Sequence, residues 1–309
     1  MLIRTNHCFK HMIPPKTGFR PRRKHAISRA IIHGVMIVVC SACVLPLLLI
    51  LSASVTDEQS LVENGFQLIP SRFSLYAYEF LLNDPNQILR AYGVSTFVTG
   101  IGSALSLLLM SLLGYAMSRK DFALRKPIAF FVFFPLLFNA GMVPFYIVMT
   151  RTLHLKDTLL ALILQPLVLP FLTLLLRTYF STLPYELVEA AKLDGASEWR
   201  IFFQIIVPLS TPALATVGLF SLLFYWNDLY LSLLFINNPQ LYTLQYLLYK
   251  ILSNLNILAD AFAQSSIKPP LQSVRMAMAV LAMGPVLFAF LFVQQYFVRG
   301  ITLGSLKGD

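Results

Sequence analysis

Apolar runs of about 20 residues or more recur along this chain, and they constrain its fold more than any other feature. A helix that crosses the hydrocarbon core of a bilayer needs about 20 predominantly apolar residues. Only 12% of the residues are charged, whereas a soluble domain carries about 25%. We therefore expect an all-α integral membrane protein of the cell membrane. Six spanning helices are predicted at about 31–54, 92–117, 128–150, 158–176, 207–236 and 276–297.

The placement of charged residues predicts that both chain ends lie in the cytosol. The formal net charge is +10, and the bases concentrate in the N-terminal arm and in the loop after the second span. Residues 55–91 have an acidic balance, which is typical of an outer loop. Basic inner loops thus alternate with less basic outer ones. Only the short link with Arg151 and Lys156 departs from this alternation, because it carries two bases on the predicted outer side. The expected organisation is a basic cytosolic arm at 1–30, a membrane domain at 31–298 and a cytosolic tail at 299–309.

The distribution of basic residues fits the positive-inside bias of membrane proteins better than a surface that binds nucleic acid. We therefore expect contact with lipid and none with nucleic acid. The chain also lacks a Gly-Lys-Ser/Thr phosphate loop and the usual hydrolase motifs. We expect no enzymatic activity and no cofactor, and any uphill transport would draw its energy from another polypeptide.

Polar residues within the predicted spans leave several alternatives open. Ser95, Thr99 and Ser103 recur at helical spacing, which suits either close helix packing or a polar path. Asp228 is the only acid inside a predicted span. It is either an interfacial residue beside Trp226 or part of a substrate path.

Residues 181–206 form a polar insert between two apolar segments. Pro184 and the acids after it predict a helix start, and Gly195 predicts its end, because glycine readily takes the left-handed conformation there. Ser197 is a suitable cap for a second helix. From the residues alone, this helix–glycine–helix element either docks into another protein or lies flat on the lipid.

A longer pattern in this insert resembles the signature loop of ATP-binding-cassette importer permeases. It consists of Glu-Ala-Ala, a glycine four positions later, and an isoleucine followed two positions later by a hydrophobic–proline pair. Val207 stands where the family usually has leucine. The matching residues are Glu189, Ala190, Ala191, Gly195, Ile205, Val207 and Pro208.

Further segments are similar to the carbohydrate-uptake, maltose-type class of these permeases. They are Leu-Lys-Asp-Thr at 155–158, Trp-Asn-Asp at 226–228, Gly300, and Lys-Gly at 307–308. The run from residues 235–238 through residues 274–276 resembles the Gram-positive branch that serves oligosaccharides and polysaccharide fragments. The resemblance covers nearly the whole chain after the basic arm.

The resemblance implies a type I importer fold with a cytosolic coupling helix at 189–195. It implies a second, different permease subunit, a cytosolic ATPase dimer that binds ATP and Mg²⁺, and an extracellular solute-binding lipoprotein. The expected ATPase-coupling residues are Glu189, Ala190, Ala191, Asp194, Gly195, Ile205 and Pro208. The C-terminal tail from Arg299 is expected to touch the ATPase as well.

Sugars are bound by aromatic faces and by amide or hydroxyl partners. The candidates for a substrate path are therefore Asn139, Tyr225, Trp226, Asn227, Asp228 and Tyr230. Three alternatives stay open: an importer permease for a non-sugar solute, a membrane-embedded glycan enzyme, and a scaffold that tethers a cytosolic partner.

Overall fold

The computed structural model describes residues 23–261 and 270–305, and the chain divides into two compact units, Met1–Leu49 and Ile50–Asp309. Helix α1 (Arg23–Ser54) supplies the described part of the first unit. Every side chain from residue 31 to residue 48 is exposed. Within α1, Ile31–Ser54 is long and apolar enough to cross a membrane, as predicted.

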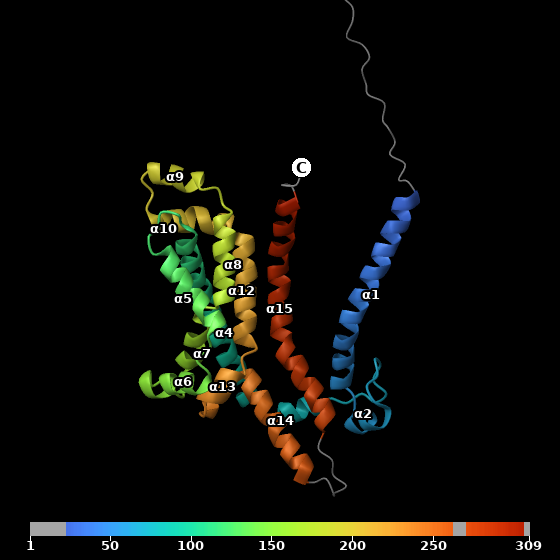
Figure 1. Ribbon diagram of the computed structural model, residues 1–309. Helices are drawn as coiled ribbons and strands as arrows, with labels where there is room; N and C mark the ends of the chain where they lie inside the picture. The colour runs from blue at the N-terminus through green and yellow to red at the C-terminus, as the bar shows by residue number, and fades with distance from the viewer. Residues whose placement is uncertain (1–22, 262–269, 306–309) are drawn as a thin grey trace, which may run out of the picture. The chain divides into compact units, whose positions relative to one another are not determined.

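The second unit consists of helices of very different lengths (Figure 1). Short helices precede and interrupt the long ones, and two of the interruptions are π-helical turns, at Val148–Thr152 and Phe202–Ile206. The α-helices are α2 (Glu58–Asn64), α3 (Tyr76–Leu81), α4 (Pro85–Ser118), α5 (Arg125–Leu137), α6 (Met142–Ile147), α7 (Leu159–Leu164), α8 (Pro170–Ser181), α9 (Glu186–Leu193), α10 (Glu198–Ile201), α11 (Val207–Leu209), α12 (Thr211–Trp226), α13 (Tyr230–Phe235), α14 (Leu244–Ala261) and α15 (Leu271–Ser305).

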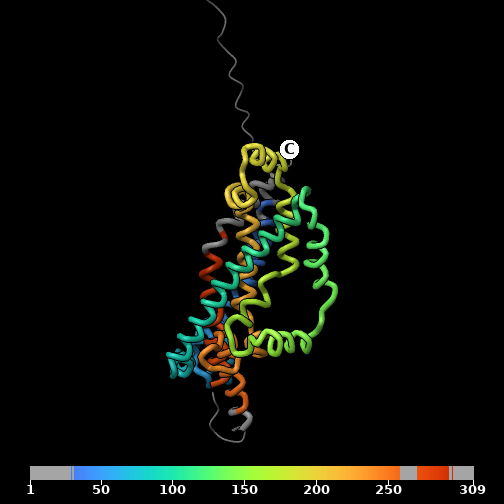
Figure 2. The backbone as a smooth tube through the Cα atoms, turned by 90° about the vertical axis from the view of Figure 1, so that its left-hand side faces the viewer, coloured from blue at the N-terminus to red at the C-terminus, as the bar shows by residue number. Residues whose placement is uncertain are grey.

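Four candidate spans are present in the described residues, or up to six if each of two bent helix pairs is one span. The predicted third span, at 128–150, is wrong as a single helix. It breaks after α5, and Met142–Thr152 continues at 118° to the first part, a corner visible in Figure 2. Gly141 adopts a φ of 84° at the break, and its N–H donates to Asn139 Oδ1 at 2.8 Å.

The predicted fourth and fifth spans also contain breaks. Leu159–Leu167 and Pro170–Phe180 meet at 44°, because Pro166 and Pro170 interrupt the backbone hydrogen bonding between them. The fifth span starts at Thr211 rather than at Val207, and its helix is interrupted between α12 and α13. The amphipathic helix α14 and the short helices α2 and α3 lie where loops were expected.

Helix α4 packs against both α8 and α12 along its small-residue face. A Cβ atom on Gly102 would lie 2.5 Å from Cε1 of the Tyr225 ring, so only glycine fits there. Ser95 Oγ accepts the Leu244 N–H at 2.7 Å, and Ser106 Oγ donates to the Pro166 carbonyl at 3.3 Å. These contacts favour close helix packing over a polar path, the two alternatives that the sequence left open for this face.

The second unit has two buried apolar clusters, one toward each end. One cluster includes Phe235, Leu244 and Val274, near the end where Figure 1 places α6, α13 and α14. The other includes Leu176, Ile201 and Phe202, near the end that carries α9 and α10. The predicted boundaries at 30 and 298 both fall inside helices, α1 and α15. Residues 1–22 of the arm, and Lys307 and Gly308 of the tail, lie outside the described residues.

Candidate functional site

The polar insert folds into two short helices joined by a tight turn at Gly195. Gly195 has a φ of 77°, its N–H donates to the Lys192 carbonyl at 3.0 Å, and the Ala196 N–H donates to the Ala191 carbonyl at 2.9 Å. This paired termination requires a left-handed residue, which explains the glycine. Ser197 Oγ accepts the Arg200 N–H at 3.4 Å and caps α10. Both predictions for this turn are confirmed, although α9 begins at Glu186, later than Pro184 suggested.

Helix α9 has one face packed on the molecule and another open. Val188 and Ala191 are buried in the neighbouring cluster. Glu189 and Ala190 are exposed, and Leu193 is 90% exposed. Two exposed leucines, Leu187 and Leu193, therefore lie among exposed carboxylates on the open side of the helix. We call this open face, made of Glu186, Leu187, Glu189, Ala190, Leu193 and Asp194, the docking face.

The structure divides the predicted coupling residues by role. Glu189, Ala190 and Asp194 lie on the docking face, and Gly195 makes the turn. Ala191 is buried and Ile205 is half-buried against the same cluster, so both hold the loop in place. Pro208 is exposed inside a helical run from α10 to α11, and the turn predicted there lies at Ser210 instead.

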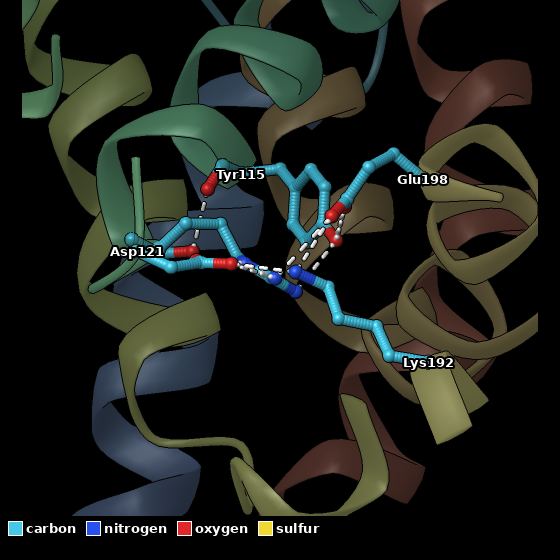
Figure 3. A network of polar contacts seen from close by, with 6 residues as sticks. Tyr115, Asp121, Lys192 and Glu198 are labelled. Atoms are coloured by element: carbon cyan, nitrogen blue, oxygen red, sulfur yellow. Dashed lines mark hydrogen bonds and ion pairs between the residues drawn. The ribbon is translucent and has the colours of Figure 1, made fainter. Parts of the chain in front are cut away.

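A network of charged side chains fastens the insert to the end of α4 (Figure 3). Arg119, the residue after α4, donates from Nε and Nη2 to the two carboxylate oxygens of Asp121 at 2.9 and 2.7 Å. Its Nη1 donates to the Tyr115 hydroxyl at 3.0 Å, and Nη2 lies 3.4 Å from Glu198 Oε1. Lys192 Nζ lies 2.6 Å from Asp121 Oδ2 and 3.0 Å from Glu198 Oε1.

These contacts change the acidity of the groups in the network. The hydrogen bonds from Arg119 hold the pKa of Asp121 well below its ordinary value, and the bond from Lys192 adds to this. Burial raises the pKa of Glu198, but the hydrogen bonds from Lys192 and Tyr115 outweigh it, so the net pKa is lowered. The hydrogen bond to Asp121 raises the pKa of Lys192. All four charged groups are therefore ionised at neutral pH.

This network was not predicted from the sequence, in which Arg119 served only as an orientation signal. The arginine and Asp121 are two residues apart immediately after a span, which was the available signal. Lys192 and Glu198 are 71 and 79 residues further along from their partners, so only the fold brings them together.

At the other end of the second unit, a hollow of about 620 Å³ opens beside the broken helices. The breaks after α5 and α12, together with the helix ends on either side of them, supply most of its wall. Asn139, Asp228 and Tyr230, three of the predicted substrate residues, line it. Asp228 Oδ1 also accepts the Leu231 N–H at 3.3 Å and caps α13. The remaining lining residues are Phe134, Pro135, Phe138, Ala140, Gly141, Met142, Phe145, Gln165, Phe224 and Leu231.

The other three predicted substrate residues lie outside this lining. The Tyr225 hydroxyl donates to the Ile163 carbonyl at 2.8 Å, and Trp226 Nε1 donates to the Ala282 carbonyl at 2.9 Å, so both side chains are buried packing residues. Asn227 Nδ2 donates to the Leu223 carbonyl at 2.9 Å. Gln165 was not among the predicted substrate residues, although its place beside Pro166 signalled a break.

The chain matches known proteins over most of its length. Residues 110–303 match the family model described as "Binding-protein-dependent transport system inner membrane component". The polygalacturonan/rhamnogalacturonan transport system permease protein YtcP of Bacillus subtilis is 37% identical over 92% of this chain and 100% of its own length. The arabinooligosaccharides transport system permease protein AraQ of Halalkalibacterium halodurans is 31% identical over 86% of this chain and 91% of its own.

A solved structure has the same fold. It is a bacterial ABC transporter involved in the import of the acidic polysaccharide alginate. One of its chains superposes with a TM-score of 0.74 at 28% sequence identity, covering 90% of this chain and 98% of that chain. The all-α fold expected from the sequence is therefore confirmed, with its spans broken where proline and glycine interrupt them.

Proposed function

The chain belongs to the family of binding-protein-dependent transport system inner membrane components, and we propose from this premise that it forms half of the translocation pathway for an oligosaccharide. As a member of that family it is the permease component of an ATP-driven importer and not an enzyme. In the proposed mechanism, α9 is seated in a cleft of a cytosolic ATPase. Closure of the ATPase dimer around ATP then displaces α9 and turns the spans outward-open.

The single observation that carries this proposal is the docking face of α9. Leu187 and Leu193 are 42% and 90% exposed on this face, and a partner protein seated on it would remove their apolar surface from water. Its carboxylates, Glu186, Glu189 and Asp194, favour a groove with basic side chains. The sequence has no phosphate loop of its own, so the energy for transport has to enter through a docked partner.

The oligosaccharide is proposed from the relatives and from the chemistry of the hollow. The names of the two relatives and of the solved transporter all refer to sugar polymers or oligomers. Asn139, Gln165 and Tyr230 offer amide and hydroxyl partners, and several phenylalanines offer apolar rings to the faces of a sugar. The hollow therefore suits a polar ligand with apolar faces better than a small ion.

The proposal requires several partners. A second, different permease subunit completes the pathway, and an extracellular solute-binding lipoprotein delivers the sugar. Two copies of the ATPase hold the ATP and Mg²⁺. Coupling is reciprocal by thermodynamic necessity: the ATPase state that favours one position of α9 is the state in which the sugar is admitted.

Charge reversal on the docking face tests the proposed coupling. Glu189→Lys in the full transporter is expected to reduce both ATPase co-purification and sugar uptake at least tenfold, because an exposed acid becomes a repelling base. The matched control is Glu79→Lys, an exposed glutamate on α3 at the opposite end. Wild-type uptake by Glu189→Lys, with the ATPase still bound, would refute the coupling role.

A substrate panel tests the choice of solute. Proteoliposomes with all subunits are supplied with oligogalacturonides, arabino-oligosaccharides, alginate oligosaccharides and, as a non-sugar, a short peptide. ATP-dependent uptake of at least one oligosaccharide, reduced by Asp228→Ala or Tyr230→Ala, is expected. Uptake of the peptide alone would favour the non-sugar alternative.

A further inference from the structure

The charged network at the end of α4 connects this helix with several other segments of the chain. Arg119 and Tyr115 are the buried members of the network on the side of α4. The Arg119 side chain is only 7% exposed, whereas those of Asp121, Lys192 and Glu198 are 39–56% exposed. The Tyr115 hydroxyl also donates to Glu198 Oε2 at 2.9 Å. A buried guanidinium is tolerated only when its donors are paired. Here the donors reach Asp121, Tyr115 and Glu198, which lie on three different segments.

The network's partners come from both helices of the insert. Lys192 is in α9, and Glu198 is in α10. The Arg119 guanidinium also lies 5.7 Å from the centroid of the Tyr185 ring, immediately before α9. The two cations and two anions balance, so the cluster gains nothing from recruiting a further ion. Every charged member therefore contributes to connecting α9 and α10 with α4.

Apolar packing alone leaves α9 weakly attached. Only Val188 and Ala191 of its eight residues are buried, and both side chains are small. The docking face points the other way, toward the partner. A pull on α9 from that partner is thus opposed mainly by the Arg119-centred network and by the chain connections at the two ends of the helix.

We propose that Arg119 is a positioning residue that ties the coupling helix to α4, so that a displacement of α9 moves the spanning helices with it. This rests on the proposed function of α9. The guanidinium forks onto both Asp121 oxygens while it also bonds Tyr115 and Glu198, a geometry that a lysine ammonium cannot reproduce. Losing it would leave a transporter that binds and runs its ATPase while moving less sugar per ATP.

The test is Arg119→Gln in the complete transporter in proteoliposomes, with ATP hydrolysis and sugar uptake measured on the same vesicles. We expect the ATPase to remain bound, hydrolysis to stay within about twofold of wild type, and uptake per ATP to fall at least tenfold. Arg119→Lys is expected to lie between the two. The matched control is Lys120→Gln, at the exposed neighbouring base, with an unchanged ratio. An unchanged ratio in Arg119→Gln would overturn the proposal.

A second variant covers the case in which Arg119→Gln fails to assemble. Lys192→Met combined with Glu198→Met removes the bridge to the insert at two exposed positions, including the hydrogen bond from Tyr115 to Glu198, and keeps the Arg119–Asp121 pair. The same loss of uptake per ATP is expected, and a wild-type ratio would again overturn the proposal. Loss of ATPase binding in the assembled double variant would also count against it, because the network is assigned to transmission and not to docking.

A covalent bridge supplies the converse test. In an Arg119→Gln transporter with Cys8, Cys40 and Cys43 replaced by serine, Asp121→Cys and Lys192→Cys are joined by a short bismaleimide. Restoration of uptake per ATP after bridging is expected if the network acts as a tether. No change despite complete bridging would show that the loss has another cause.

Discussion

Single residues on α4 set how closely the helices approach. The hydroxyl and glycine positions of this helix face lie against α8, α12 and the start of α14, where larger side chains would push the helices apart. Gly114 resembles Gly102 in this respect, because a Cβ there would lie 3.0 Å from Leu176 Cβ. Glycine at these positions lowers the intrinsic stability of the helix, but it allows the neighbouring helices to approach closely.

Gly102→Ala tests this at the residue scale. The added methyl group would meet the Tyr225 ring at 2.5 Å, and overpacking of a buried site costs about 1–3 kcal/mol. We expect a lower melting temperature in detergent. Gly100→Ala, two positions away in the same helix with open space around it, should be neutral or stabilising by about 0.5–1 kcal/mol. Equal melting temperatures for both variants would contradict the packing role.

At the scale of elements, a single residue holds two distant links of the chain together. Asp157, at a φ of 57°, lies in the link before α7. Its carboxylate accepts the N–H groups of Asn237 and Asn238, and its own N–H donates to the Phe235 carbonyl at 2.9 Å. One residue thus joins the link before α7 to the segment that follows α13.

Asp157→Gly should loosen this junction. Glycine keeps the positive φ but removes the carboxylate, so amide hydrogen exchange at 237–241 is expected to rise, while Asp157→Asn, which keeps one acceptor oxygen, changes it less. Lys156→Ala is the neighbouring control. Exchange at wild-type rate in Asp157→Gly would show that the carboxylate contributes nothing to the junction.

The same contact has a defined pH dependence. The hydrogen bonds from Asn237 and Asn238 lower the pKa of Asp157. A lowered native pKa contributes stability above the pKa of the unfolded chain, about 3.9, and that stability is lost as pH falls through the native value. Exchange at 237–241, corrected for its intrinsic pH dependence, should therefore stay constant from about pH 8 down to pH 5 and rise only in stronger acid. A rise centred near pH 6.5 would contradict the assignment to Asp157, because a carboxylate with a lowered pKa is already ionised there.

At the scale of the whole molecule, the docking face and the hollow lie at opposite ends of the second unit. α9 and α10 share their end with the basic loop after α4, which the positive-inside bias assigns to the cytosol (Figure 1). The residues that line the hollow carry one carboxylate and lie toward the other end. Under the proposed function, energy and substrate therefore reach this chain from opposite sides of the membrane.

Cysteine labelling tests that arrangement. In a background without native cysteines, Leu193→Cys should react with a membrane-impermeant maleimide only from the cytosolic side, and Glu63→Cys, exposed in α2, only from outside. The charge distribution of the loops is the physical reason for this orientation. Labelling of both sites from one side would contradict it.

The sequence by itself determined the class of fold, the end of α9 at Gly195 and the family. These depend on local physics: apolar length sets the spans, and a left-handed turn demands glycine. It also named Asn139, Asp228 and Tyr230 of the hollow. It misjudged the third span, because proline and glycine only signal a break and do not set its angle.

Only the tertiary structure decided which polar residues meet. Tyr225 and Trp226 had the right chemistry for a sugar, yet the fold turns both toward backbone carbonyls in the core. Arg119 and Glu198 are 79 residues apart, and neither has a local pattern that predicts the other. Helix periodicity fixes the face on which a side chain lies, but the partner of that face follows from the packing of helices distant in sequence.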